Sequence, residues 1–380
     1  MMDSDAVQTL ILSDLTPLLP CGPGVPPLLR KPTLENTSSL LRLAHGKLHT
    51  FPYHAVPLHW RLLYTDAALL RSLAQLRASH PPADIIRTLD MALILTHAPG
   101  PSRTDTIHGL ITHLSTLLPA PPPAPPFPSS ADSLPINHPI PRLPSPSMHT
   151  FQAHLSTSNT PLHLFRTIDW PAHTLWRTPS YLLSLTSSGT RLVPIELGRT
   201  YTSAAWTQKL IPFAEFMETY ILSPHPTTAY LAQHNLFTQI PALRNDITVP
   251  DYCYTEPPVH GDKELEEPVV NAWFGPAGTV SPLHTDPYAN ILVQVVGRKY
   301  LRLYRPAAKV YPRGEEGGVD MSNTSEVDVE DVDHGKFPDF AEEDYVECIL
   351  EPGDAVYIPA GWWHYLRSLE VSFSVSFWWT

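Results

Sequence analysis

The first third of the chain repeats its apolar residues at intervals of three and four positions. From Trp60 to Leu76 the leucines form one broad stripe, which predicts an amphipathic helix. A second helix is expected from Asp84, a suitable N-cap, to Leu95, and a third near Thr106 to Leu118. Residues 1–118 are therefore predicted to form an all-α domain. Its histidines show no metal-ligand spacing, so a packing or docking role is the simplest interpretation.

After residue 148 the apolar period shortens to two. From Val371 to Phe377 apolar residues alternate with serines, which predicts a strand with one buried face. The runs 291–296 and 299–304, separated only by Gly-Arg, predict a β-hairpin with a short turn. Further strands are expected at residues 192–196, 228–233, 271–274 and 355–358. Many short strands with Gly/Pro turns favour a β-barrel or jelly roll, so the fold class is α+β.

Proline separates these two regions. The chain has 44 prolines, and 12 of them lie between Pro119 and Pro146. Each proline fixes its own φ and disfavours helix at the preceding residue, so residues 119–148 are predicted to be an extended linker. A ligand for SH3 or WW domains is the functional alternative.

The acidic residues are equally local. The chain carries 25 basic and 37 acidic side chains, and residues 315–347 alone contain 13 acids and one base. The rest of the chain carries 24 basic and 24 acidic side chains, so we interpret residues 315–347 as an acidic insertion within the C-terminal domain. The simplest interpretation is a solvated loop; the alternative is a surface that attracts a basic substrate segment. The net charge of −12 argues against a general nucleic-acid binder.

Three cysteines far apart in the sequence exclude a disulfide framework and a zinc ribbon, which favours a reducing compartment. Residues 1–14 carry acids where a secretory signal carries bases, and no apolar run reaches the ~18 residues of a membrane span. The expectation is a soluble intracellular protein of the nucleus or cytoplasm that does not bind membranes.

The candidate chemistry begins at His284 and Asp286. Residues two apart on an extended segment point to the same side, so both could bind one metal ion. His364, which follows a turn, a short strand and a second turn, is the best third ligand. Two histidines and one carboxylate on one face suit a non-haem Fe(II) oxygenase, because positions stay open for a 2-oxo acid and O2. A simple zinc or manganese cupin is an alternative.

The far carboxylate of such a 2-oxo acid needs a cation. Lys299 opens the strand that follows the His-x-Asp pair and is the obvious candidate. The alternative for Lys299 is an ordinary solvated lysine at a strand edge.

The C-terminal region resembles a known family, the JmjC-type oxygenases with a double-stranded β-helix. The resembling blocks are residues 193–198, 230–234, 247–253, 271–276, 281–284, 294–300 and 372–379. The resemblance implies a double-stranded β-helix of the cupin or jelly-roll type over residues 149–380. The acidic insertion and the long linker depart from the family pattern, and neither contains a candidate metal ligand.

The resemblance also implies roles for individual residues. It implies that Fe(II) is bound by His284, Asp286 and His364 as the catalytic set. It implies that 2-oxoglutarate is held by Lys299, Tyr230, Ser281 and Asn290. Residues of the substrate pocket would be Glu196, Tyr201 and Trp273, because a carboxylate with aromatic neighbours suits a guanidinium group. The alternatives are a surface acid at Glu196 and plain core residues at Tyr230 and Trp273.

By the same resemblance the chain is expected to be a 2-oxoglutarate- and O2-dependent oxygenase that hydroxylates a protein side chain, most simply arginine. Its partner would be a basic Arg/Lys-containing segment of a histone, ribosomal or chromatin-associated protein. Demethylation of methyl-lysine on histones is the alternative, since the ligand motifs do not separate the two reactions. A catalytically silent cupin scaffold is the non-enzyme alternative.

Overall fold

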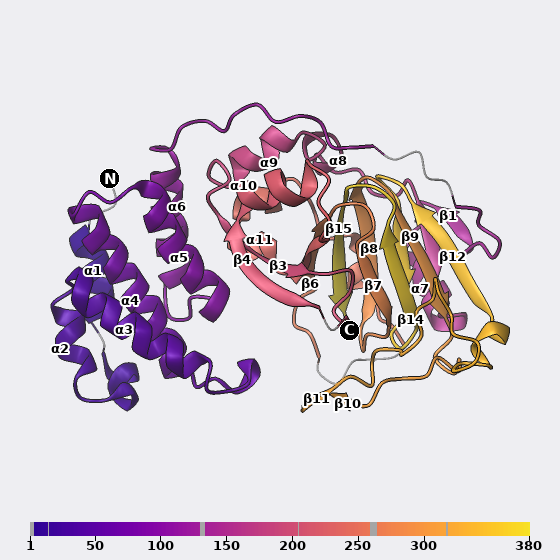
Figure 1. The fold of residues 1–380 in the computed structure, drawn as a ribbon, viewed down its shortest axis with the longest axis horizontal. Coiled ribbons are helices and arrows are strands. Elements are labelled where there is room, and N and C mark those ends of the chain that lie inside the picture. Colours follow the sequence, from indigo (N-terminus) through magenta and orange to yellow (C-terminus); the bar gives the residue numbers. More distant parts are fainter. Residues whose placement is uncertain (1–3, 14, 130–133, 204, 259–263, 317) are drawn as a thin grey trace. The chain divides into compact units, whose positions relative to one another are not determined.

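The computed structural model describes residues 4–13, 15–129, 134–203, 205–258, 264–316 and 318–380. The chain divides into two compact units. The first unit contains the residues up to Pro122 together with Leu183–Leu192 and Pro212–Ala214, and the second contains the remainder. Figure 1 shows the helical N-terminal part in indigo and purple and the strands chiefly in orange and yellow.

The N-terminal part of the first unit is helical, as predicted. Its helices are α1 (Ser4–Leu12), α2 (Val25–Arg30), α3 (Leu34–Leu48), α4 (Leu58–Arg77), α5 (Pro82–Thr96) and α6 (Arg103–Ser115). Helix α4 contains the predicted leucine stripe, and its buried face packs against α3 and α5. Helix α5 begins two residues before Asp84, with Pro82 at its first position, because proline's fixed φ suits a helix start. Asp84 therefore lies in the first turn instead of capping the helix.

The strands form two main sheets that lie in the C-terminal part of the chain. They are β1 (Arg142–Pro144), β2 (Leu162–Phe165), β3 (Leu192–Leu197), β4 (Thr207–Pro212), β5 (Ala229–His234), β6 (Val269–Gly275), β7 (Val280–His284), β8 (Ala289–Val296), β9 (Lys299–Tyr304), β10 (Glu315–Glu316), β11 (Val319–Asp320), β12 (Tyr345–Leu350), β13 (Ala355–Ile358), β14 (Trp363–Ser368) and β15 (Ser372–Trp379). One sheet has the order β1-β2-β13-β8-β15-β6-β5-β3-β4, and the other has the order β12-β9-β14-β7. Apart from the parallel pair β1–β2, the pairings from β2 to β3 in the larger sheet and all those of the smaller sheet are antiparallel.

Short helices accompany these strands. They are α7 (Met148–Thr157), α8 (Ala172–Leu175), α9 (Pro179–Leu185), α10 (Phe213–Phe216), α11 (Leu236–Gln239) and α12 (Pro241–Arg244). A helical N-terminal region followed by a sheet-rich, mainly antiparallel region confirms the predicted α+β class.

The two sheets pack face to face around an apolar core. Leu292 of β8 and Ile358 of β13 contribute from the larger sheet, and Leu301 and Leu303 of β9 contribute from the smaller one. Such sheet-on-sheet packing buries the alternate residues of each strand, as in a jelly roll.

Strand β15 alternates as predicted, but both of its faces are buried. Phe373 packs outward against Trp176 with ring centroids 4.6 Å apart. The serine face points into the barrel, where Ser374 donates a hydrogen bond to Gln294 and Ser376 accepts one from Trp273. The prediction of a single buried face was therefore wrong, because the serine positions of this strand face the interior of the barrel instead of water.

The predicted β-hairpin at 291–304 is also wrong. β8 pairs with β13 and β15 of the larger sheet, whereas β9 pairs with β12 and β14 of the smaller sheet. Gly297 lies where the chain crosses from one sheet to the other, with φ of +67°. A Cβ at this position would lie 2.0 Å from the carbonyl oxygen of Val371, so the crossing needs a residue without a side chain.

Two segments pack more closely on the sheets than the sequence suggested. In the expected linker, Ile140 is buried with the inter-sheet core and the backbone of residues 138–140 is hydrogen-bonded to Glu347. In the acidic insertion, Val327, Val329 and Phe337 belong to a core that covers β7, β9 and β14. The interpretation of the insertion as a merely solvated loop is therefore wrong for these residues.

Candidate metal centre and active-site pocket

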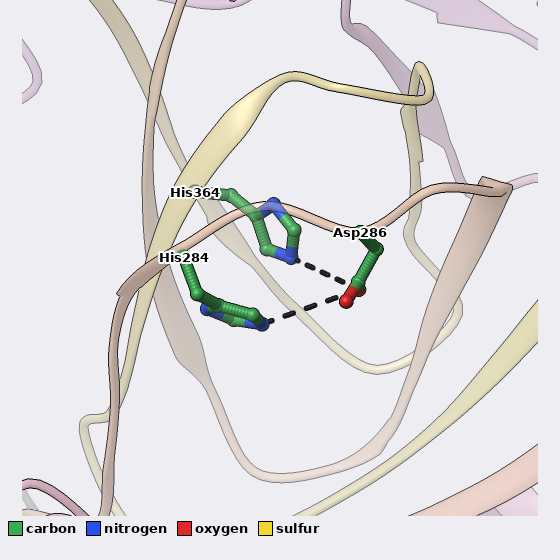
Figure 2. Close-up of side chains that lie close together, drawn as sticks. All are labelled: His284, Asp286 and His364. Carbon is green, nitrogen blue, oxygen red and sulfur yellow. Dashed lines mark ion pairs between the residues drawn. The ribbon is translucent and has the colours of Figure 1, made fainter. Parts of the chain in front are cut away.

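The three candidate metal ligands lie together in the second unit. His284 ends β7 and is directly paired with His364 of β14, while Asp286 follows in the turn after β7. The Asp286 carboxylate lies 4.0 Å from Nε2 of His284 and 3.5 Å from Nε2 of His364. One ligand atom from each residue fits within 4.8 Å, and Figure 2 shows the three side chains pointing toward one another. This spacing fits one shared metal ion.

Backbone carbonyl groups fix how the two imidazoles are protonated. Nδ1 of His284 lies 2.7 Å from the oxygen of Pro282, and Nδ1 of His364 lies 2.9 Å from the oxygen of Trp362. A carbonyl only accepts hydrogen bonds, so each Nδ1 carries the proton and each Nε2 keeps its lone pair. Both Nε2 atoms are thus oriented and available as metal ligands.

The pKa values favour the ligand forms of these groups. Burial and the neighbouring His364 lower the pKa of His284 to about 4, so its imidazole is neutral at physiological pH. Burial acts to raise the pKa of Asp286, but the adjacent His364 and His284 side chains outweigh it and leave this pKa below its ordinary value. A neutral imidazole and an ionised carboxylate are the states that bind a cation.

The predicted co-substrate residues line the same cavity. Tyr230 of β5, Ser281 of β7, Asn290 of β8 and Lys299 of β9 border it together with the three metal candidates. Lys299 is only 1% exposed, and its Nζ lies 3.3 Å from the hydroxyl of Tyr230. Burial lowers the pKa of Lys299 to about 7. The alternative of a solvated lysine is therefore wrong.

A second pocket adjoins this cavity and shares Tyr230, Trp273, Ser281, His284 and Asp286 with it. The predicted substrate residues Glu196, Tyr201 and Trp273 all border this pocket. Burial raises the pKa of Glu196, and the neighbouring Trp206 indole acts in the opposite direction. The structure thus gathers every predicted site residue around one connected space, and their individual roles remain predictions.

Sequence reasoning missed several residues of the pocket. Trp206 comes from the loop before β4, and Met321, Asn323 and Thr324 come from the acidic insertion. The surrounding sequence has no spacing that links these residues to His284. The pairing of His284 with Thr324 in space brings the insertion to the pocket.

Comparisons with known proteins agree with this geometry. A family model described as a cupin-like domain matches residues 148–380, more than half of the chain. The chain belongs to this cupin-like family. Among its relatives, lysine-specific demethylase 8 of Danio rerio is 39% identical over 366 residues, which cover 91% of this chain and 87% of that protein.

Other relatives match mainly the C-terminal region. Lysine-specific demethylase 8 of Xenopus tropicalis is 48% identical over 244 residues, covering 63% of this chain and 53% of that protein. Lysine-specific demethylase JMJ30 of Arabidopsis thaliana is 48% identical over 216 residues, covering 56% and 47%. The chain therefore spans about half the length of these two relatives. The cupin-like domain and these relatives place the chain in the JmjC class of 2-oxoglutarate-dependent oxygenases.

The residues of this JmjC domain fit the Fe(II) and 2-oxoglutarate on which the class generally depends. Oδ1 of Asn290 is buried and has no hydrogen-bond partner among the described residues, although it faces the cavity. Lys299 brings a buried amine to the same cavity. A buried cation is matched by an anionic ligand such as a carboxylate, whereas the unpaired amide oxygen, which only accepts, is matched by a hydrogen-bond donor. Among the described residues, no helix is long and apolar enough to cross a membrane.

Proposed function

We propose that the chain is an Fe(II)- and 2-oxoglutarate-dependent protein oxygenase that hydroxylates an arginine side chain. The observation that carries the proposal is the half-buried carboxylate of Glu196, which borders one pocket with Tyr201, Trp206 and the candidate ligands His284 and Asp286. A guanidinium group matches a buried carboxylate through paired N–H donors and stacks on aromatic rings.

In this proposal each group of residues has one task. His284, Asp286 and His364 hold the iron, with their orientation fixed by the carbonyl groups of Pro282 and Trp362. Fe(II) and 2-oxoglutarate, when bound, supply the chemistry that inserts one oxygen atom of O2 into a substrate C–H bond while the oxo acid is converted to succinate and CO2.

The remaining residues bind and orient the two organic molecules. Lys299 and Tyr230 hold the far carboxylate of 2-oxoglutarate, and Ser281 and Asn290 donate or accept hydrogen bonds along it. Glu196 and Tyr201 bind the substrate cation, with Trp206 and Trp273 excluding water around it. The partner would be a basic segment of a histone, ribosomal or chromatin-associated protein, which places the reaction in the nucleus or cytoplasm.

Demethylation of methyl-lysine is the second candidate. It is favoured by the names of the relatives and by the aromatic residues of the pocket, because aromatic rings also bind methylated ammonium groups. The buried carboxylate favours a group that donates N–H bonds and so supports arginine.

Mass spectrometry separates these reactions. Basic peptides containing arginine or methyl-lysine are incubated with the protein, Fe(II) and 2-oxoglutarate. A gain of about 16 Da on arginine supports hydroxylation, and a loss of about 14 Da from lysine indicates demethylation. His284→Ala and Asp286→Ala should abolish succinate release. Failure of the wild-type protein to release succinate with any peptide would favour the silent scaffold instead.

A further inference from the structure

The acidic insertion contacts the segment that carries two candidate metal ligands. The backbone N–H of Thr285 donates to the oxygen of Asn323 at 2.8 Å, and the N–H of Ser325 donates to the oxygen of Leu283 at 2.8 Å. Thr324 lies between these two bonds, opposite His284 in an antiparallel bridge. Residues 323–325 are thus held against the pocket by backbone hydrogen bonds, in a fixed position relative to the site.

A chain of side-chain hydrogen bonds runs from this segment to the pocket. The hydroxyl of Thr324, which is 1% exposed, donates to Oδ1 of Asn323 at 3.2 Å. The Asn323 amide is oriented by its Nδ2, which donates to the oxygen of Thr285 at 3.5 Å. With the single proton of Thr324 directed to Asn323, we assign the hydroxyl of Tyr201, 3.1 Å away, as the donor to Thr324.

The direction of these bonds determines what Tyr201 offers to a ligand. With its proton directed to Thr324, the Tyr201 oxygen presents only lone pairs to the pocket. Burial, together with the charges of Asp286 and Glu196, raises the pKa of Tyr201 to about 12 although the hydrogen bond with Thr324 acts in the opposite direction, so the phenol is protonated at physiological pH. Tyr201 and the carboxylate of Glu196 therefore present only hydrogen-bond acceptors to the pocket.

We propose that Thr324 and Asn323 are positioning residues that hold Tyr201 as a hydrogen-bond acceptor, so that the pocket selects side chains rich in N–H donors. This inference rests on the proposed oxygenase function and gives a physical reason for its preference for guanidinium groups, which carry several N–H donors. A trimethylammonium group has no N–H, so it forms no N–H hydrogen bond with these acceptors, although its charge is still attracted to Glu196. The acidic insertion thereby acts on substrate choice through one buried threonine, independently of its exposed charges.

The test compares Thr324→Val, which keeps the shape of the side chain but loses the acceptor, with Thr324→Ser, which keeps the hydroxyl. Binding of a fluorescently labelled arginine peptide is measured by anisotropy in the full-length protein. We expect Thr324→Val to weaken binding roughly three- to tenfold, as for the loss of one neutral hydrogen bond, and Thr324→Ser to restore it. Tyr201→Phe should weaken binding similarly, and the double variant Tyr201→Phe/Thr324→Val should be no worse than Tyr201→Phe.

Unchanged binding in Thr324→Val, equal weakening in both Thr324 variants, or absence of arginine-peptide binding by the wild-type protein would overturn the inference. Thermal unfolding of each variant identifies a general loss of structure, and in that case Tyr201→Phe decides the outcome. Turnover is recorded separately: a wild-type protein that binds the peptide but does not hydroxylate it contradicts the proposed function and leaves the positioning role standing.

Discussion

Two ionisable side chains of the pocket lie where burial disfavours their charged forms. Lys299 is buried at the inner end, and Glu196 is half-buried at the substrate end. Burial disfavours the charged form of each, so it lowers the pKa of Lys299 and raises that of Glu196. A ligand of opposite charge reverses both shifts, so ligand binding should move protons.

The first residue-scale prediction concerns Lys299. With a pKa of about 7, this amine is mostly neutral at pH 8 and mostly protonated at pH 6. A bound carboxylate raises the pKa, so 2-oxoglutarate binding should take up roughly one proton per molecule at pH 8 and close to none at pH 6. Anaerobic calorimetry in buffers of different ionisation enthalpy measures this uptake. Equal proton uptake at the two pH values would contradict the assignment.

A second residue-scale prediction concerns Glu196→Gln. Removing a half-buried charge should raise the melting temperature of the ligand-free protein, while kcat/KM for an arginine peptide should fall about 10- to 100-fold through loss of a charged hydrogen bond. Glu315→Gln, an exposed acid of the insertion, is the matched control and should alter neither quantity appreciably. Parallel losses in the two variants would point to net charge instead of a specific contact.

At the scale of elements, periodicity identified helices α4, α5 and α6 and strands β3, β5, β6, β8, β9, β13 and β15, and local spacing identified the His284-x-Asp286 pair. These patterns depend on residues close in sequence. The partner of each strand depends on distant residues, which is why 291–304 was predicted as a hairpin although its two strands belong to different sheets. Thr324 and Trp206 were missed for the same reason, since only long-range pairing brings them to the pocket.

The crossing between sheets gives an element-scale prediction. Gly297→Ala would place a Cβ 2.0 Å from the oxygen of Val371 and force an alanine to a φ of +67°. We expect a loss of more than about 2 kcal/mol in the free energy of unfolding, measured by urea denaturation. Gly278→Ala is the control: its φ is +82° but no atom lies within 4 Å, so only the cost of about 1 kcal/mol for the backbone conformation should appear.

At the scale of the whole molecule, the units do not follow the order of the chain. Residues Leu183–Leu192 come after the Pro-rich stretch and yet belong to the first unit with the helices. Arg191 of this segment forms three hydrogen bonds of 2.7 to 2.9 Å with the carboxylate of Asp90 on α5, and that carboxylate also accepts from the N–H of Leu192. A division of the chain in the Pro-rich stretch would therefore separate Arg191 and Leu192 from the carboxylate that they contact.

The whole-molecule prediction uses this ion pair. The side chains of Arg191 and Asp90 are 4% and 0% exposed, so Asp90→Ala breaks a buried ion pair by removing its anionic member. The free energy of unfolding should fall by about 3–5 kcal/mol in chemical denaturation. Adding Arg191→Met should recover part of this loss. Asp84→Ala, at the half-exposed ion pair with Arg87 on the same helix, should cost less than about 1 kcal/mol.

The insertion that packs on β7, β9 and β14 can change in evolution separately from the residues proposed to bind iron and 2-oxoglutarate. Asn323 and Thr324 of the insertion border the pocket proposed for the substrate, while the candidate iron and co-substrate residues lie outside the insertion. We therefore expect side-chain substitutions in this segment that keep its backbone hydrogen bonds to Leu283 and Thr285 to alter the preferred target and to leave the oxidation chemistry intact. On the proposed function, enzymes with the same three ligands can diverge in substrate through a segment of acidic composition that contains none of those ligands.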